Sequence, residues 1–310
     1  MAMTIDRSVH DFVDAVGSDD AVCVVGGRTQ WDVGGLPSQS ARLVRAPAGI
    51  VDYSPAEMTV RVGAATTIAE IDTELASQGQ TTVLEGPLDA TVGGILAVGR
   101  SGLRRMRVGP LRDALLQVRY VSSDGRLITA GGPTVKNVTG YDLCRLMVGS
   151  LGTLGCFAEV ILRTRPRPTA RQWWAIAGDP FAVTARLYRP STVLWDGETT
   201  WVQLEGHAED VDAQGAIVAR FGGTECDGPP ALPAIRSSVA PSELASVVRD
   251  GVAGYCVVEI GIGVVYGQRP IPRPLPPGPI VELHRRFRRE FDPTQRLNPG
   301  RDPLHALQVA

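Results

Sequence analysis

The chain has 310 residues, of which 44% are hydrophobic and 21% are charged. This composition excludes a disordered chain, a coiled coil and a collagen-like fibre, because each of these needs a stronger compositional bias. With 31 basic and 33 acidic residues the formal net charge is −2, so no electrostatic argument favours nucleic acid or an anionic membrane as a partner. The length predicts two domains, each able to bury a core.

The cysteines and the amino-terminal residues indicate a reduced cytoplasmic protein. The five cysteines form no C-x-x-C pair and no Cys/His spacing typical of a metal site. Residues 1–20 are too acidic and polar for a signal peptide, and no apolar run reaches the about 18 residues of a membrane-spanning helix. We therefore expect a cytoplasmic location, with any association with the inner membrane made through partners and without direct insertion.

The first half of the chain alternates short helices with strands. Residues 6–17 place their apolar side chains on one helical face, and residues 67–77 do the same. The apolar runs at 21–25 and 58–62 predict buried strands, and each is followed by glycine.

A hairpin and a proline-rich break come next. An Asp-Gly turn joins strands predicted at 116–122 and 126–130, and a further strand is predicted at 156–163. Pro166 and Pro168 then favour extended backbone and mark a predicted domain edge.

Beyond this edge, strands and helices alternate in the order of a split β-α-β unit. Its predicted elements are strands at 172–177, 192–195, 201–205 and 255–260 and helices at 180–189 and 208–221. Residues 268–279 are rich in proline, and an amphipathic helix is predicted at about 280–291. The arginines of that helix suit either a solvated face or a partner-binding face.

Two glycine-containing stretches have the pattern of an anion-binding site. Residues 26–30 (Gly-Gly-Arg-Thr-Gln) follow a strand, and glycines allow successive backbone N–H groups to face one phosphate. Thr91 is placed to cap a helix beginning at Gly93 and Gly94, which would offer free N–H groups and a helix dipole. Taken alone, the first pattern is more often only a turn, and the second is also typical of a glycine-lined helix–helix contact. Neither is G-x-G-x-x-G or a Walker A motif, so the common nucleotide-binding motifs are not supported.

Three further stretches follow in chain order. Residues 101–113 contain several arginines, which alone would indicate only a solvated basic loop. Residues 135–142 include Lys136, the single lysine among the 31 basic residues. Residues 149–155 (Gly-Ser-Leu-Gly-Thr-Leu-Gly) lead into a predicted strand.

Together, and in this order, the five stretches resemble the PCMH-type FAD-binding domain of the vanillyl-alcohol oxidase superfamily. The patterns that carry the resemblance are T-V-G-G, R-R-M-x-V-G-x-x-R-D, K-N-V-x-G-Y-D and G-S-L-G-T-L-G. Residues 291–301 are similar to the family's closing F-D-P…N-P-G-(K/R) signature. Within the superfamily the chain looks most like the FAD-binding (E-type) subunit of glycolate oxidase.

The resemblance implies an α+β fold with a cofactor held between two subdomains. Residues 1–168 would form the PCMH-type FAD-binding domain, and residues 169–267 a small ferredoxin-like (split β-α-β) cap. Residues 268–310 would form a proline-rich linker, a helix and a segment that returns to the FAD domain. The pyrophosphate would lie against the first two glycine stretches, the next two loops would line the flavin, and the adenosine end would meet the strand backbone. The implied cofactor-binding residues are Gly26, Gly27, Arg28, Thr29, Gln30, Thr91, Val92, Gly93, Gly94, Ser101, Arg105, Gly109, Asp113, Lys136, Asn137, Gly140, Tyr141, Asp142, Gly152, Thr153, Gly155 and Val160.

The chain departs from the family in two respects. Members with a covalent flavin often place a histidine in the first loop, which here reads Gly-Gly-Arg-Thr-Gln, so we expect non-covalent FAD. Related 2-hydroxy-acid dehydrogenases carry an H-x-G-D-G-N stretch in the cap, and this sequence has none. No catalytic residue and no metal ligand is assigned from the sequence.

The resemblance implies an FAD-dependent oxidoreductase that oxidises a small 2-hydroxy acid or alcohol. Its expected partners are a homologous flavoprotein subunit and an iron–sulfur subunit that receives the electrons. A non-catalytic flavin-binding relay or scaffold subunit and a stand-alone FAD oxidase of an alcohol or sugar remain alternatives. The missing cap histidines favour the oxidoreductase subunit of a complex and the non-catalytic subunit. Only the stand-alone oxidase predicts turnover by the isolated chain.

Lys136 is predicted to tune the reduction potential of the flavin, because it lies in one of the loops that the resemblance brings to the flavin. A cation near the N1–C2=O edge would stabilise the anionic reduced flavin. At about 1–3 kcal/mol for such a contact, Lys136→Met should lower the two-electron potential by about 20–65 mV. Lys136→Arg should also disturb the site through its size. Potentiometric titration at matched FAD occupancy checks this, and equal potentials in all three proteins would contradict it.

Overall fold

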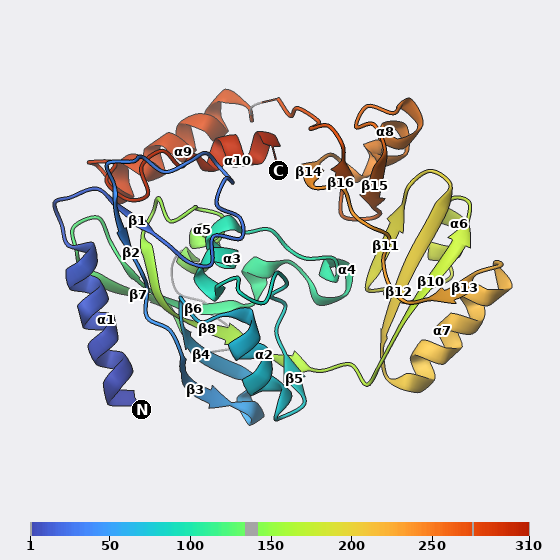
Figure 1. Cartoon of the computed structure of the whole chain (residues 1–310), viewed down its shortest axis with the longest axis horizontal. Helices are drawn as coiled ribbons and strands as arrows, with labels where there is room; N and C mark the ends of the chain where they lie inside the picture. The colour runs from blue at the N-terminus through green and yellow to red at the C-terminus, as the bar shows by residue number, and fades with distance from the viewer. Residues whose placement is uncertain (1, 134–141, 275, 310) are drawn as a thin grey trace. The chain divides into compact units, whose positions relative to one another are not determined.

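The computed structural model describes residues 2–133, 142–274 and 276–309, which form two compact units (Figure 1). The first unit comprises Met1–Gly102, Pro110–Pro166 and Leu275–Ala306. The second comprises Leu103–Gly109, Arg167–Pro274 and Leu307–Ala310. The short segment Leu103–Gly109 is thus flanked in sequence by the first unit and has its contacts in the second.

A five-stranded antiparallel sheet forms the core of the first unit, with the strand order β3-β4-β8-β6-β7. Its strands are β3 (Ile50–Ser54), β4 (Thr59–Gly63), β6 (Leu115–Val121), β7 (Leu127–Gly131) and β8 (Cys156–Arg163). The central strand, β8, buries seven of its eight residues. Among them is Glu159, whose carboxylate pairs with Arg61 on β4 (2.6 Å) and Arg119 on β6 (3.4 Å). The two guanidinium groups compensate a charge that burial alone would make costly.

Helices and short strand pairs complete the first unit. They are α1 (Ala2–Val16), α2 (Ile68–Ala76), α3 (Val92–Val98), α5 (Leu143–Met147), α9 (Gly278–Phe291), α10 (Pro303–Val309), β1 (Val22–Val24) with β2 (Arg42–Val44), and β5 (Gln80–Thr81) with β9 (Arg165–Pro166). Helix α2 begins at a capping box in which Thr67 Oγ1 accepts from the Glu70 N–H and the Glu70 carboxylate accepts from the Thr67 N–H. The helix predicted at 67–77 therefore begins directly after its N-cap residue, Thr67.

The carboxyl-terminal segment returns to the first unit and is held there by Arg296. This side chain is 3% exposed, and its guanidinium donates hydrogen bonds to three backbone carbonyls. Nε lies 2.8 Å from the Asp20 oxygen and Nη1 lies 3.1 Å from the Ser123 oxygen, while Nη2 donates to Val16. Arg296 thus bonds carbonyl groups at the end of α1, in the segment after α1 and in the β6–β7 turn, and the bond to Val16 is buried.

A seven-stranded antiparallel sheet forms the second unit, in the order β13-β10-β12-β11-β15-β16-β14. Its elements are β10 (Ala170–Ala177), β11 (Thr192–Trp195), β12 (Thr199–Gly206), β13 (Thr224–Cys226), β14 (Ile235–Ser238), β15 (Cys256–Glu259), β16 (Val264–Gly267), α4 (Arg105–Val108), α6 (Phe181–Thr184), α7 (Ala208–Arg220) and α8 (Leu244–Asp250). The run β10-α6-β11-β12-α7-β13, with the order β13-β10-β12-β11, is the split β-α-β arrangement. The α+β class predicted from the sequence is confirmed.

Several elements differ from the sequence-based prediction. The strand predicted at 255–260 corresponds to β15, which pairs with β11 and does not complete the split β-α-β unit. The strand that completes it is β13, which pairs with β10. Strand β13 has three residues and none of them is buried, so it carries no hydrophobic alternation that marks it. The edge strands β2 and β3 were missed for the same reason. The helix predicted at 180–189 is the single turn α6.

The thiols of the described residues are free, and all except that of Cys226 are buried. Burial raises the pKa of Cys144 to about 11 and that of Cys156 to about 12. Both groups are therefore neutral thiols near neutral pH and act as small apolar side chains. In the described part of the chain, no helix is both long and apolar enough to cross a membrane.

Replacing Arg296 should destabilise the first unit. Arg296→Met leaves three carbonyls without their donor, and we expect the free energy of unfolding to fall by about 2–4 kcal/mol. Arg289→Met serves as the control, because the ion pair of Arg289 with Glu282 joins two side chains that are 59% and 58% exposed. Such a surface pair contributes less than about 1 kcal/mol. Urea unfolding of both variants checks this, and equal midpoints would contradict it.

Candidate cofactor site

The loop after β1 presents an unusual run of unpaired donors. Among the described residues, none accepts a hydrogen bond from the backbone N–H groups of Gly26 to Gln30, five in succession. Arg28 lies within this run in the left-handed region, with φ 58°. Where a residue in the left-handed region alternates with residues in the right-handed region, successive N–H groups can turn toward a common point. This is the geometry of an anion-binding nest. The loop is therefore suited to a group with several negatively charged oxygens.

Two glycines allow this loop to lie directly on the segment before α3. A Cβ built on Gly26 would overlap the Thr91 hydroxyl, and a Cβ on Gly27 would overlap the Asp89 carbonyl oxygen. A side chain at Gly27 would require the backbone to move, and one at Gly26 would require the Thr91 side chain to move. The close approach brings the loop and the start of α3 to the same pocket.

Helix α3 is capped as the sequence predicts, but its first N–H groups are not free. Thr91 Oγ1 accepts from the Gly94 N–H at 3.2 Å. Val92 and Gly93 donate to carbonyls of residues 64–66, at 2.9 and 2.7 Å. The expectation that this helix offers free N–H groups to an anion is therefore wrong, because the adjacent segment already uses them.

The two glycines of α3 have different surroundings. A Cβ on Gly93 would lie 2.9 Å from both the Cβ and the carbonyl oxygen of Ala64, so this glycine serves packing. A Cβ on Gly94 would meet only the Thr91 hydroxyl, at 3.0 Å, and Gly94 is exposed to the pocket. A side chain at Gly94 would project into the space that a ligand needs.

The second glycine loop, 149–155, is bonded to α3. The N–H groups of Gly149 and Leu151 donate to carbonyls of α3 at 3.0 and 2.8 Å. Gly152 lines the pocket, whereas Thr153 is buried and its hydroxyl donates to the Ser150 carbonyl. A Cβ on Gly155 would overlap the ring of Tyr120, so this glycine serves packing.

Two pocket residues, Asn298 and Arg301, were not identified as site residues from the sequence. Asn298 is 4% exposed and accepts from the Val24 N–H at 3.0 Å while donating to the Gly152 carbonyl at 2.9 Å. Both residues belong to the closing N-P-G-R pattern, which was the signal available. The resemblance treats this pattern as a family signature and assigns no ligand contact to it.

Arg301 supplies positive charge to the pocket beside Arg28. It is 7% exposed, donates to the carbonyls of Val33 and Gly35, and lies over the ring of Trp31 at 4.8 Å. Arg28 lies over the same ring at 5.1 Å. Burial lowers the pKa of Arg301, but a guanidinium stays protonated in proteins.

The described pocket residues fit a diphosphate. Two adjoining pockets share seven lining residues, namely Val24, Gly26, Thr91, Gly94, Ala97, Leu151 and Asn298. Among all their described lining residues only Arg28 and Arg301 are charged, and neither pocket is lined by a carboxylate. Unpaired N–H groups, two guanidinium groups and the absence of a lining carboxylate suit the phosphate oxygens of a dinucleotide cofactor.

Other residues named from the sequence are not among the described lining residues of these pockets. Ser101 Oγ accepts from the Leu111 N–H at 3.2 Å. Asp113 and Asp142 both pair with Arg145, at 2.8 and 3.2 Å. Val160 is buried in β8, and Arg105 and Gly109 belong to the second unit. Lys136, Asn137, Gly140 and Tyr141 lie outside the described residues.

Comparison with known proteins assigns the class. Residues 9–131 match the family described as FAD binding domain. The chain is thus a PCMH-type FAD-binding protein of the vanillyl-alcohol oxidase superfamily, and the cofactor of this domain is FAD. Among solved structures, alkyldihydroxyacetonephosphate synthase matches with a TM-score of 0.70 over 95% of this chain and 74% of that chain. At 15% identity this match shows the fold alone.

Glycolate oxidase subunit GlcE of Escherichia coli (strain K12) is a relative. It is 33% identical over 233 residues, which are 72% of this chain and 66% of that protein. D-lactate dehydrogenase of Archaeoglobus fulgidus is 42% identical over 82 residues, 26% of this chain and 18% of that protein. The chain thus covers just under two thirds of the first relative and under a fifth of the second.

Gly94→Val should prevent FAD binding without unfolding the protein. The side chain would project into the pocket, where a Cβ meets only the Thr91 hydroxyl within 4 Å. Loss of contacts to a charged group at about 1.5–3 kcal/mol predicts at least about a tenfold lower affinity for FAD. Flavin absorbance per protein and circular dichroism measure binding and folding separately.

Gly228→Val is the matched control, because a Cβ there meets no atom within 4 Å. It should retain the parent's FAD content. Equal FAD content in the Gly94 variant and the parent would show that Gly94 does not border the cofactor.

Proposed function

We propose that this chain is the FAD-binding subunit of an oxidoreductase complex that oxidises a small 2-hydroxy acid. The chain would act on a CH–OH group, and the electrons would pass to an iron–sulfur partner. A homologous flavoprotein subunit would complete the complex. The observation that carries the proposal is the set of unpaired N–H groups and arginines around one pocket, in a chain 33% identical to GlcE over 233 residues.

The pocket residues have definite roles in this proposal. The N–H groups of Gly26 to Gln30 and the guanidinium groups of Arg28 and Arg301 would bind the FAD pyrophosphate non-covalently. Asn298 would hold the two glycine loops at the distance that the cofactor requires. FAD, when bound, supplies the acceptor for the two electrons and the hydrogen that leave the carbinol carbon.

A second candidate, a non-catalytic flavin-binding subunit, is favoured by the histidines. His10, His207, His284 and His305 are all exposed, and none of them lines the described pockets. Oxidation of a 2-hydroxy acid needs a base near the substrate hydroxyl, and no described pocket residue is a histidine, lysine or carboxylate. In this candidate the homologous subunit carries the chemistry.

Turnover by the assembled complex tests the proposal. The full chain is purified alone and with its native partners, and dye reduction is measured with glycolate and D-lactate as probe substrates. We expect the complex to contain iron and reduce the dye, and the isolated chain to bind FAD but turn over at least about tenfold more slowly. Acid or heat denaturation should release the FAD. Full turnover by the isolated chain with oxygen would instead identify a stand-alone oxidase.

The Gly94→Val variant separates the two candidates within the complex. If this chain's flavin takes part in turnover, the variant complex assembles but loses dye reduction. If the chain is a scaffold, the variant complex keeps the parent's activity, because the homologous subunit still holds its own flavin.

A further inference from the structure

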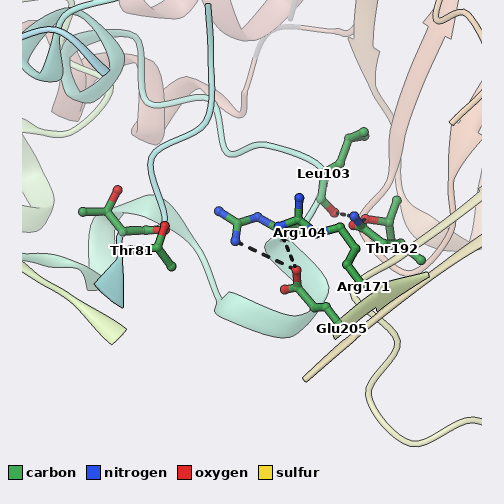
Figure 2. Close-up of polar contacts among 8 residues, drawn as sticks. Thr81, Leu103, Arg104, Arg171, Thr192 and Glu205 are labelled. Atoms are coloured by element: carbon green, nitrogen blue, oxygen red, sulfur yellow. Dashed lines mark hydrogen bonds and ion pairs between the residues drawn. The ribbon is translucent and has the colours of Figure 1, made fainter. Parts of the chain in front are cut away.

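The segment Leu103–Gly109 is anchored in the second unit, although its sequence neighbours belong to the first. Figure 2 shows the start of this anchor, where the Leu103 carbonyl accepts a hydrogen bond from Thr192 Oγ1 on β11 (2.9 Å). Thr192 is fully buried. The Leu103 side chain packs against the cluster of Trp173, Leu194 and Val257 on the same sheet. The anchor therefore begins with a buried backbone contact.

Arg104 extends the anchor to a buried carboxylate. Glu205 on β12 is 5% exposed, and its Oε2 lies 4.0 Å from Arg104 Nη1 and 3.4 Å from Arg171 Nη2 (Figure 2). The Arg104 side chain is 12% exposed and that of Arg171 is 50% exposed. Arg171 lies within hydrogen-bond distance but is exposed, whereas the contact of Arg104 is longer and better shielded from screening by solvent.

Two further contacts hold α4. The guanidinium of Arg107 donates to the Arg189 carbonyl at 3.0 Å, and that of Arg189 donates to the Arg107 carbonyl at 3.2 Å. Met106 packs against the core of the second unit, close to Gly261. The four residues Leu103, Arg104, Met106 and Arg107 thus each contact the second unit.

The anchor is joined to the cofactor pocket through a short stretch of chain. Helix α3 lines the pocket with Gly94, Ala97 and Val98 and ends at Gly99, four positions before Leu103. The two flanks of the anchored segment are themselves joined, because Ser101 Oγ accepts from the Leu111 N–H. Only a few residues of chain thus separate the anchored segment from the end of the pocket-lining helix.

We propose that Glu205 is a positioning residue for the FAD site. It holds Arg104, and with it the segment Leu103–Gly109, and so fixes the chain that leaves α3. Glu205 acts from the second unit, without contact to the cofactor. The inference rests on the FAD-binding role of the first unit within the proposed function, but not on the identity of the substrate.

FAD titration of the full-length apoprotein tests this positioning role. Glu205→Gln removes the charge that holds Arg104, and we expect the Kd for FAD to rise at least about fivefold, the lower range of coupling between distinct sites. Arg171→Gln is the matched control, since it removes the exposed partner of the same carboxylate, and its Kd should stay within about twofold of the parent. An unchanged Kd for Glu205→Gln, or an equal rise in both variants, would overturn the proposal.

Trypsin cleavage reports on the anchor itself. Cleavage after Arg104, Arg105 and Arg107 should accelerate in Glu205→Gln relative to cleavage after Arg126, whose side chain is 76% exposed. A weaker FAD affinity without this selective acceleration would mean general destabilisation and would also reject the positioning role. Failure of the parent to bind FAD would reject the proposed function instead, so the two failures are distinguishable.

A double-mutant cycle excludes a purely structural effect. Arg104→Gln and Glu205→Gln break the same contact, so the double variant should bind FAD about as weakly as either single variant. Additive losses would overturn the proposal. If Glu205→Gln does not fold, Thr192→Val is the substitute, because it keeps the side-chain shape and removes the hydroxyl that bonds the Leu103 carbonyl and, within the same sheet, Gln203 Oε1. The same Kd criterion then applies.

Discussion

Asn298 connects the segments on which the candidate cofactor site depends. Its carboxamide accepts from the Val24 N–H and donates to the Gly152 carbonyl, residues that are 274 and 146 positions away in sequence. It adopts a left-handed backbone conformation, with φ 47°, which asparagine tolerates better than most residues. Because both backbone groups are shielded from water, an apolar side chain at this position would leave each of them unsatisfied. The loop after β1, the second glycine loop and the pocket between them are thereby held in one arrangement.

The pocket of the first unit and the anchor in the second unit use arginine in different ways. In the first unit Arg28 and Arg301 lie beside unpaired N–H groups, and no carboxylate lines the same pockets among the described residues. In the second unit Arg104 and Arg171 lie against the buried carboxylate of Glu205. The first arrangement leaves positive potential available to an anionic ligand, whereas the second compensates it. The R-R-M-R pattern therefore contributes contacts to the second unit, although its neighbours in sequence belong to the FAD-binding family match.

This separation bears on how the proposed oxidoreductase would work. In the proposed function the groups that would contact the diphosphate all belong to the first unit, namely the N–H groups of Gly26 to Gln30 and the arginines Arg28 and Arg301. Substrate oxidation requires a base and an electron acceptor, which the described pocket residues do not include. The anchored segment gives the second unit a means to affect FAD affinity from outside the pocket.

The sequence by itself determined the α+β class and the strong helices and strands, and it singled out the glycine loop Gly26–Gln30 for the proposed site. These follow from local periodicity, from capping residues such as Thr67 and from glycines that must accommodate close contacts. Tertiary structure decided which donors remain free, because the N–H groups of Val92 and Gly93 bond to a segment that the helix sequence does not contain. It also decided that β13 completes the split β-α-β unit and that Leu103–Gly109 packs into the second unit. Edge strands and long-range hydrogen bonds depend on partners distant in sequence, so local patterns carry little information about them.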